Sequence, residues 1–115
     1  MEEILANLAQ VNGIQGALLI GKDGLVIAYA GDIPTDADFI GATICEFYGS
    51  AENIVQEKFE IGKLGRVTVE ADSARYYLEN INNDTFLVTI GTPVANLGLI
   101  RLEIKAAAEN LRAVL

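Results

Sequence analysis

Residues 14–30 read IQGALLIGKDGLVIAYA, two apolar runs separated by a short polar turn. Ile14–Ile20 and Leu25–Ala30 have the composition of strands, and the Asp23-Gly24 step between them is a strong hairpin signal. Ala17–Ile20 is apolar at every position, which is typical of a strand that is covered on both faces. The stretch therefore predicts a β-hairpin whose first strand lies inside a sheet sandwiched between helices.

The rest of the chain extends this hairpin into an α+β fold. The expected helices are Glu2–Asn12, a long helix from a Thr35 cap to about Glu60, and a closing helix that starts at Thr92-Pro93. The further expected strands are Leu64–Ala71, Arg75–Ile81 and Thr85–Ile90, separated by polar turns. The order α-β-β-α-β-β-β-α predicts one five-stranded, largely antiparallel sheet with helices on both faces.

The composition predicts a single domain over residues 1–115, because 51% of the residues are hydrophobic and only 21% are charged. A net charge of −8 repels phosphate groups and anionic lipid headgroups, so we expect neither nucleic acid as a partner nor membrane insertion. No stretch resembles a signal peptide or a membrane span, and the lone Cys45 can form no internal disulfide. We therefore expect a cytoplasmic protein.

The residues that usually carry catalysis are scarce. The chain has no histidine, so the thiol of Cys45 has no imidazole to activate it, and this cysteine is expected to be a buried small residue. Asp36 and Asp38 stand at a helix start, where they complement the helix dipole. Gly16–Lys22 has the glycine and lysine spacing of a phosphate-binding loop, but its middle is a β-run and Asp23 replaces the magnesium-binding hydroxyl. We expect no catalytic residue, cofactor or metal.

Residues 66–70 predict an edge strand that pairs with a second copy of the chain. Arg66, Val67, Thr68, Val69 and Glu70 alternate polar with apolar side chains, as in a strand that is not fully enclosed. If two copies pair antiparallel about Thr68, Arg66 faces Glu70 of the second copy and Val67 faces Val69. The alternative is that Arg66 and Glu70 are ordinary solvated residues.

The long helix carries two stripes. The larger residues are Ile40, Ile44, Phe47, Ala51, Ile54 and Val55, and the small ones are Ala42, Cys45, Gly49 and Asn53. We expect the large residues to pack on the sheet of the same chain, while the small ones allow a partner helix to approach closely. The small residues fit equally well beneath a neighbouring loop.

Two phrases of the sequence resemble the roadblock/dynein light chain family, and the resemblance covers essentially the whole chain. The first is Val11–Ile20 with Asp23–Ile27, similar to the family's opening helix end and hairpin, and the second is Asn96–Leu102, similar to the start of its last helix. The resemblance implies a homodimer with joined edge strands and the two long helices side by side. It also implies a scaffold or regulator of Ras-like small GTPases in prokaryotes, or a dynein or endosomal scaffold component in eukaryotes.

A GTPase regulator of this family would act by conformation, holding the switch loops while catalysis stays in the GTPase. Arg66, Arg75, Arg101 and Arg112 are scattered over predicted strands and the last helix, so none is expected to act as an arginine finger. The family arrangement would turn a further set of long-helix residues toward a partner: Asp38, Gly41, Glu46, Ser50 and Glu57.

Two other functions remain open from the sequence. A sensor domain would bind a small molecule between an antiparallel sheet and its helices. A structural light-chain subunit would link larger proteins and meet no GTPase.

Overall fold

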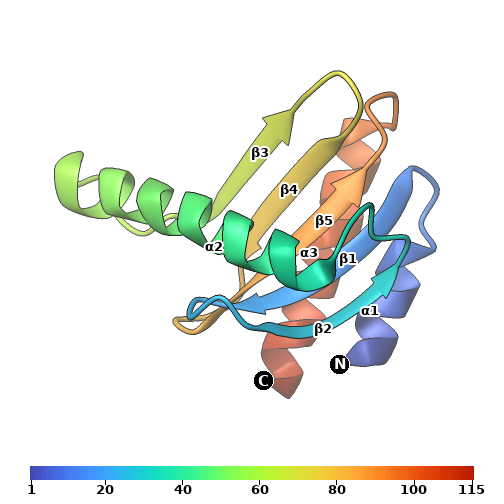
Figure 1. Cartoon of the computed structure of the whole chain (residues 1–115), viewed down its shortest axis with the longest axis horizontal. Coiled ribbons are helices and arrows are strands. Elements are labelled where there is room, and N and C mark those ends of the chain that lie inside the picture. The colour runs from blue at the N-terminus through green and yellow to red at the C-terminus, as the bar shows by residue number, and fades with distance from the viewer.

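The strands form one antiparallel sheet in the order β2-β1-β5-β4-β3, as shown by a computed structural model that describes residues 1–115 (Figure 1). The strands are β1 (Ile14–Gly21), β2 (Val26–Gly31), β3 (Arg66–Glu70), β4 (Arg75–Asn80) and β5 (Thr85–Gly91). The helices are α1 (Glu2–Ala9), α2 (Ala37–Asn53) with its five-residue π-helical continuation η1 (Ile54–Lys58), and α3 (Leu97–Val114). The predicted α+β class and element order are confirmed.

Helices cover both faces of the sheet, as predicted. α1 and α3 pack on one face around Leu19 and Leu87, and α2 packs on the other around Leu18 and Val88. These four side chains are fully buried, and they belong to the adjacent central strands β1 and β5. Neighbouring residues of a strand point to opposite faces, so a strand covered by helices on both sides is apolar at most of its positions.

The helix boundaries differ from the sequence predictions. α1 ends at Ala9 because the next amides form tighter turn bonds, such as Val11 N to Leu8 O at 3.1 Å. Asp36, not Thr35, caps α2, since its Oδ1 accepts from the Asp38 amide at 2.9 Å.

The closing helix also starts later than predicted. Thr92 and Pro93 belong to a turn in which the Ala95 amide donates to the Thr92 carbonyl at 3.4 Å. Asn96 then caps α3 by accepting from the Leu99 amide at 3.1 Å. An asparagine side chain at this position satisfies an amide that the helix itself leaves free.

The glycine and lysine spacing of Gly16–Lys22 belongs to a strand and a turn. Gly16 and Gly21 lie within β1, which is paired with strands on both sides, and Lys22 begins the turn to β2. The backbone amides of a paired strand are engaged in the sheet, so this stretch forms no phosphate cradle.

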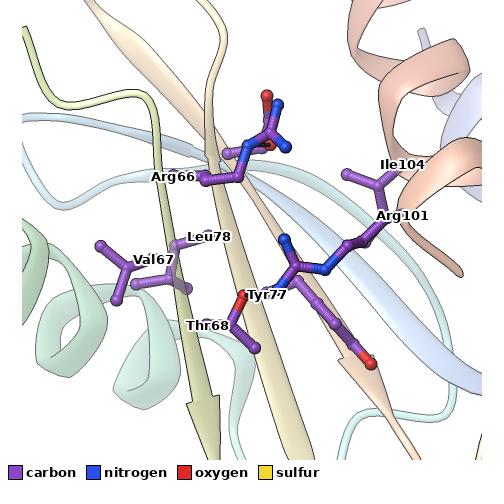
Figure 2. Close-up of a pocket in the computed structure, with 8 residues that line it drawn as sticks. Arg66, Val67, Thr68, Tyr77, Leu78, Arg101 and Ile104 are labelled. Atoms are coloured by element: carbon purple, nitrogen blue, oxygen red, sulfur yellow. Dashed lines mark hydrogen bonds and ion pairs between the residues drawn. The ribbon is translucent and has the colours of Figure 1, made fainter. Parts of the chain in front are cut away.

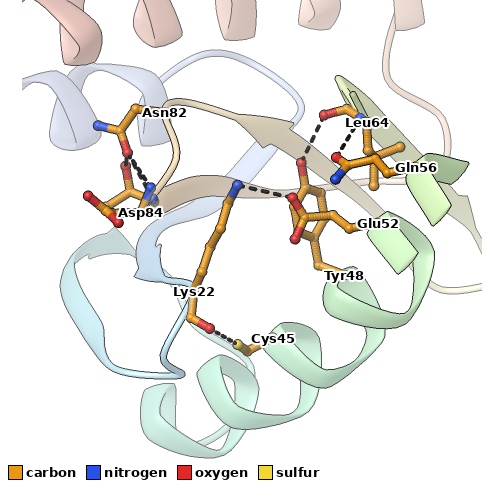
Figure 3. Close-up of polar contacts among 9 residues, drawn as sticks. Lys22, Cys45, Tyr48, Glu52, Gln56, Leu64, Asn82 and Asp84 are labelled. Atoms are coloured by element: carbon orange, nitrogen blue, oxygen red, sulfur yellow. Dashed lines mark hydrogen bonds and ion pairs between the residues drawn. The ribbon is translucent and has the colours of Figure 1, made fainter. Parts of the chain in front are cut away.

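α2 lies across the face of the sheet opposite α1 and α3, and its end continues as η1 past the edge strand β3 (Figure 1). Tyr48 anchors the middle of the helix: it is 1% exposed, and its ring stacks on Phe86 with centroids 4.5 Å apart. Lys22 Nζ lies 3.0 Å from Glu52 Oε2, and the Cys45 thiol donates to the Lys22 carbonyl at 3.2 Å (Figure 3). These contacts fasten one flank of α2 to the β1–β2 turn.

The prediction that the whole stripe of large residues on α2 packs on the sheet was wrong in part. Ile40 is buried, but Phe47 and Ile54 are exposed, and the sequence analysis missed Tyr48. The helix is rotated so that Tyr48 faces the sheet, which carries Phe47 and Ile54 to the flank opposite Cys45.

No helix in the structure has both the length and the apolar character needed to cross a bilayer.

Candidate interaction surface

The strand β3 is an edge of the sheet, as predicted, since it pairs with β4 alone. Just before β3, the Gly65 carbonyl accepts from the Asn80 amide of β4 at 2.8 Å. Consecutive residues of an antiparallel strand direct their backbone polar groups to opposite sides. Arg66, Thr68 and Glu70 therefore point their amides and carbonyls away from β4, where another strand can bind them.

This orientation limits the ways in which two copies of β3 can pair. A two-fold axis at Thr68 sets Thr68 opposite itself and Arg66 opposite Glu70, so that every outward-pointing group meets another. An axis midway between two residues would instead set each outward-pointing group opposite one that points into its own sheet. The register expected from the sequence is compatible with the backbone.

The two valines of β3 lie on the face of the sheet that α2 covers. Val67 packs against the core beneath α2, whereas Val69 is 36% exposed. A change at Val67 would therefore disturb folding, while Val69 is free to contact a partner.

The charged residues of β3 lie on the opposite face and already have partners in the chain. Arg66 Nε lies 3.4 Å from Glu79 Oε1, and Arg75 Nε lies 3.8 Å from Glu70 Oε1. A cross-subunit pair between Arg66 and Glu70 would thus join an existing network and would not neutralise free charges.

Large apolar side chains are exposed on the part of the molecule that reaches past the edge. Phe47 and Ile54 share one side of the helix because they are seven residues apart, and Phe59 and Ile61 follow it with 65% and 72% of their surfaces exposed. We call these four side chains, together with Val69 of the edge strand, the apolar flank. Exposed apolar groups of this size mark interaction sites in soluble proteins.

Sequence reasoning missed Phe59 and Ile61. The helix predicted to about Glu60 includes Phe59. The signal that was available is that both residues lie at the end of this helix, just before Gly62. Large apolar residues in such a segment need a partner to cover them.

The small-residue stripe lies on the other flank of α2. Its members are Ala42, Cys45, Gly49 and Asn53, of which Cys45 is half-buried and the other three are exposed. Cys45 and Glu52 contact Lys22, so this flank faces the β1–β2 turn and lies away from Phe47. Burial raises the pKa of the Cys45 thiol, and the nearby charges of Asp23 and Glu52 add to this rise.

The residues predicted to face a protein partner fall into two groups. Four of them are exposed: Asp38, Glu46, Ser50 and Glu57. Gly41 is buried, and a Cβ at this position would meet Val26 Cγ2 at 2.6 Å and the Gly24 carbonyl at 3.3 Å. Gly41 is therefore a close-packing residue beneath the hairpin, and the prediction that it faces a partner was wrong.

The arginines are less scattered than the sequence suggests. All four lie on the neighbouring elements β3, β4 and α3: Arg66, Arg75, Arg101 and Arg112. Arg66, Thr68 and Arg101 line a hollow of about 20 Å³ between β3 and α3, room for about one water molecule (Figure 2). Burial raises the pKa of the Glu79 carboxyl, although Arg66, Arg112 and Arg101 act in the opposite direction.

No three histidine, cysteine, aspartate or glutamate side chains gather as metal ligands would. The stacked Tyr48 and Phe86 rings fill the layer between α2 and the sheet, where a sensor domain would hold its ligand.

Comparisons with known proteins agree with this architecture. The family model described as the Roadblock/LC7 domain matches residues 1–91. Two proteins of Methanocaldococcus jannaschii, named uncharacterized proteins MJ1340 and MJ0310, are each 32% identical over 114 residues, covering 99% of this chain and 98% of theirs.

Solved structures share the fold at lower sequence identity. A Roadblock/LC7 domain from Streptomyces avermitilis is 22% identical with a TM-score of 0.90, covering 99% of this chain and 96% of that one. MglB from Myxococcus xanthus is 20% identical with a TM-score of 0.90, covering 98% and 92%. A structure titled MglB with tetrameric arrangement is 22% identical with a TM-score of 0.86, covering 97% and 85%. The matched family model, the near full-length relatives and the shared fold together place this chain in the Roadblock/LC7 family.

Proposed function

We propose that the chain forms a homodimer that binds a Ras-like small GTPase as a scaffold or regulator and contributes no catalytic residue of its own. One observation carries the dimer: α2 and η1 reach past the open β3 edge (Figure 1), and their large side chains Phe47 and Ile54 are exposed. An unpaired strand beside exposed apolar groups is unfavourable in water, and a two-fold axis at Thr68 would cover both at once.

The apolar flank, not the small-residue stripe, is the part of α2 that we assign to the dimer. Phe47 and Ile54 lie on the flank opposite the β1–β2 turn, and Val69 extends the same surface onto the edge strand. The stripe containing Gly49 stays beside the turn. Self-association also agrees with the similar MglB structure whose title describes a tetrameric arrangement.

A small GTPase is the partner that the family resemblance implies for a prokaryotic protein. Joined β3 edges would bring the two α2 helices side by side and present the exposed Asp38, Glu46, Ser50 and Glu57 on one face. Such a face would hold the switch loops of a GTPase in one arrangement, and the hydrolytic chemistry would stay in the GTPase's own site.

Light scattering of three proteins tests the dimer. We expect the wild-type chain to be dimeric and Val69→Lys to be monomeric, since the substitution sets a lysine opposite Val67 of the second copy and weakens association about tenfold or more. Val94→Lys is the matched control, because Val94 is 90% exposed and lies in the turn before α3. A monomeric wild-type chain would contradict the proposal.

Nucleotide-dependent binding tests the partner. Immobilised dimer should retain a Ras-like GTPase from the same organism differently when it carries GDP or a non-hydrolysable GTP analogue. Glu46→Lys with Glu57→Lys should weaken retention about tenfold, whereas Glu109→Lys on the far face should not. No retention in either nucleotide state would exclude the GTPase and leave the structural light-chain function.

A further inference from the structure

We infer that the α3 side of the joined edges binds an acidic peptide segment of a partner protein, an inference that rests on the dimer proposed above. The residues that carry it are Arg66, Thr68, Arg101 and Lys105, which we call the arginine trough. The side of the molecule that bears the trough differs in charge from the rest of the chain.

The charge distribution is uneven. β3, β4 and α3 carry five of the eight basic residues: Arg66, Arg75, Arg101, Lys105 and Arg112. The same elements carry four of the sixteen acidic residues: Glu70, Glu79, Glu103 and Glu109. The rest of the chain therefore has three basic and twelve acidic residues, so this side is where a negatively charged segment meets the least repulsion.

Two of these cations donate hydrogen bonds to backbone carbonyls of the chain itself. Arg75 Nη1 donates to the Ala95 carbonyl at 3.0 Å, and Arg112 donates to the carbonyls of Ile81 at 2.9 Å and Asn80 at 2.6 Å. These arginines fasten α3 and the segment before it to β4, and they have little capacity left for a ligand.

Arg101 and Lys105 make fewer polar contacts within the chain. Arg101 reaches across Tyr77 to the edge strand, where its Nη2 donates to the Thr68 hydroxyl at 3.3 Å (Figure 2). That contact uses one of five guanidinium donors. Lys105 lies one helical turn further along the same side of α3, is exposed and forms no ion pair in the chain.

The proposed two-fold axis doubles this arrangement. Because each Arg101 is held at Thr68, and Thr68 lies at the axis, both guanidiniums come to the same face of the joined sheet. The two β3 strands form the floor between them, and the two α3 helices form the walls. Two like charges in one trough repel each other, and an anion between them removes the repulsion.

Carboxylates of a peptide fit this trough. A guanidinium binds a carboxylate through two parallel hydrogen bonds, and Lys105 adds a second cation along each wall. The carboxylates of β3 and β4 already have partners, since Glu70 is beside Arg75 and Glu79 is beside Arg66. Nucleic acid is disfavoured because a phosphate polymer would extend over the acidic remainder of a protein of net charge −8.

Fluorescence anisotropy with a labelled, glutamate-rich synthetic peptide tests the trough at low salt. We expect the wild-type dimer to bind the peptide and Arg101→Gln with Lys105→Gln to weaken binding about tenfold. Lys58→Gln with Lys63→Gln is the matched control: it removes the same charge from exposed residues on η1 and the following loop, and should change affinity less than about twofold.

Light scattering on the same samples separates the two proposals. If both double variants weaken binding equally while all samples are dimeric, or if the wild-type dimer binds no peptide, the trough is refuted and the dimer stands. Peptide binding to monomeric Val69→Lys as tight as to the wild type would refute a shared trough, as would tighter binding of a single-stranded oligonucleotide of equal charge. A monomeric wild type overturns both proposals.

Discussion

Glu79 shows how burial and charge compete at one side chain of β4. Only 13% of its side chain is exposed, while Arg66 lies 3.4 Å and Arg112 4.0 Å from its carboxylate oxygens. Loss of hydration is the larger effect, so the pKa of the carboxyl lies above its ordinary value of 4.5 despite the arginines.

The raised pKa of Glu79 predicts how stability depends on pH. Between pH 4.5 and the higher pKa of the native state, Glu79 is protonated in the native state and ionised in the unfolded chain. The free energy of unfolding therefore falls as the pH rises through this interval. Urea unfolding from pH 4 to pH 7 should show this fall in the wild type relative to Glu79→Gln. A constant difference between the two proteins across the range would contradict the prediction.

The helix α2 carries two glycines in contrasting environments. A Cβ at Gly49 would meet no atom within 4 Å, whereas a Cβ at Gly41 would meet Val26 Cγ2 at 2.6 Å. Glycine within a helix reduces stability relative to alanine because the unfolded chain has more freedom to lose.

Gly49→Ala should therefore increase the free energy of unfolding by about 0.5–1 kcal/mol. The dimer should persist, because Gly49 lies on the flank of α2 beside the β1–β2 turn and the apolar flank lies opposite. Gly41→Ala is the control on the same helix, where the contact with Val26 offsets the gain. Urea unfolding and light scattering together check this. Loss of the dimer in Gly49→Ala would indicate that the small-residue stripe forms part of the interface.

The thermal stability of the proposed dimer should depend on protein concentration. If folding of the chain is coupled to pairing of its β3 edges, the Tm must rise with protein concentration, because dilution favours dissociation. Calorimetry over a hundredfold range of concentration should show the rise in the wild type and in Val94→Lys. Val69→Lys should unfold at a Tm that does not depend on concentration, and the same constancy in the wild type would count against a dimer.

Some features of this protein follow from its sequence alone. The hairpin at Asp23-Gly24, the apolar runs in the central strands β1 and β5, and the alternating edge strand β3 are readable because strand and helix periods are set by local backbone geometry. The family can also be recognised from the sequence, because the phrases that resemble it are continuous stretches of residues.

The tertiary structure decided what these local patterns leave open. Whether Phe47 or Tyr48 faces the sheet depends on the rotation with which α2 docks, and neighbouring residues of a helix differ by only about 100°. The contact between Arg101 and Thr68 joins residues 33 positions apart, and no spacing rule reaches that far. Periodicity fixes which residues share a face of an element, but only packing of the elements fixes where that face points and which distant side chains meet there.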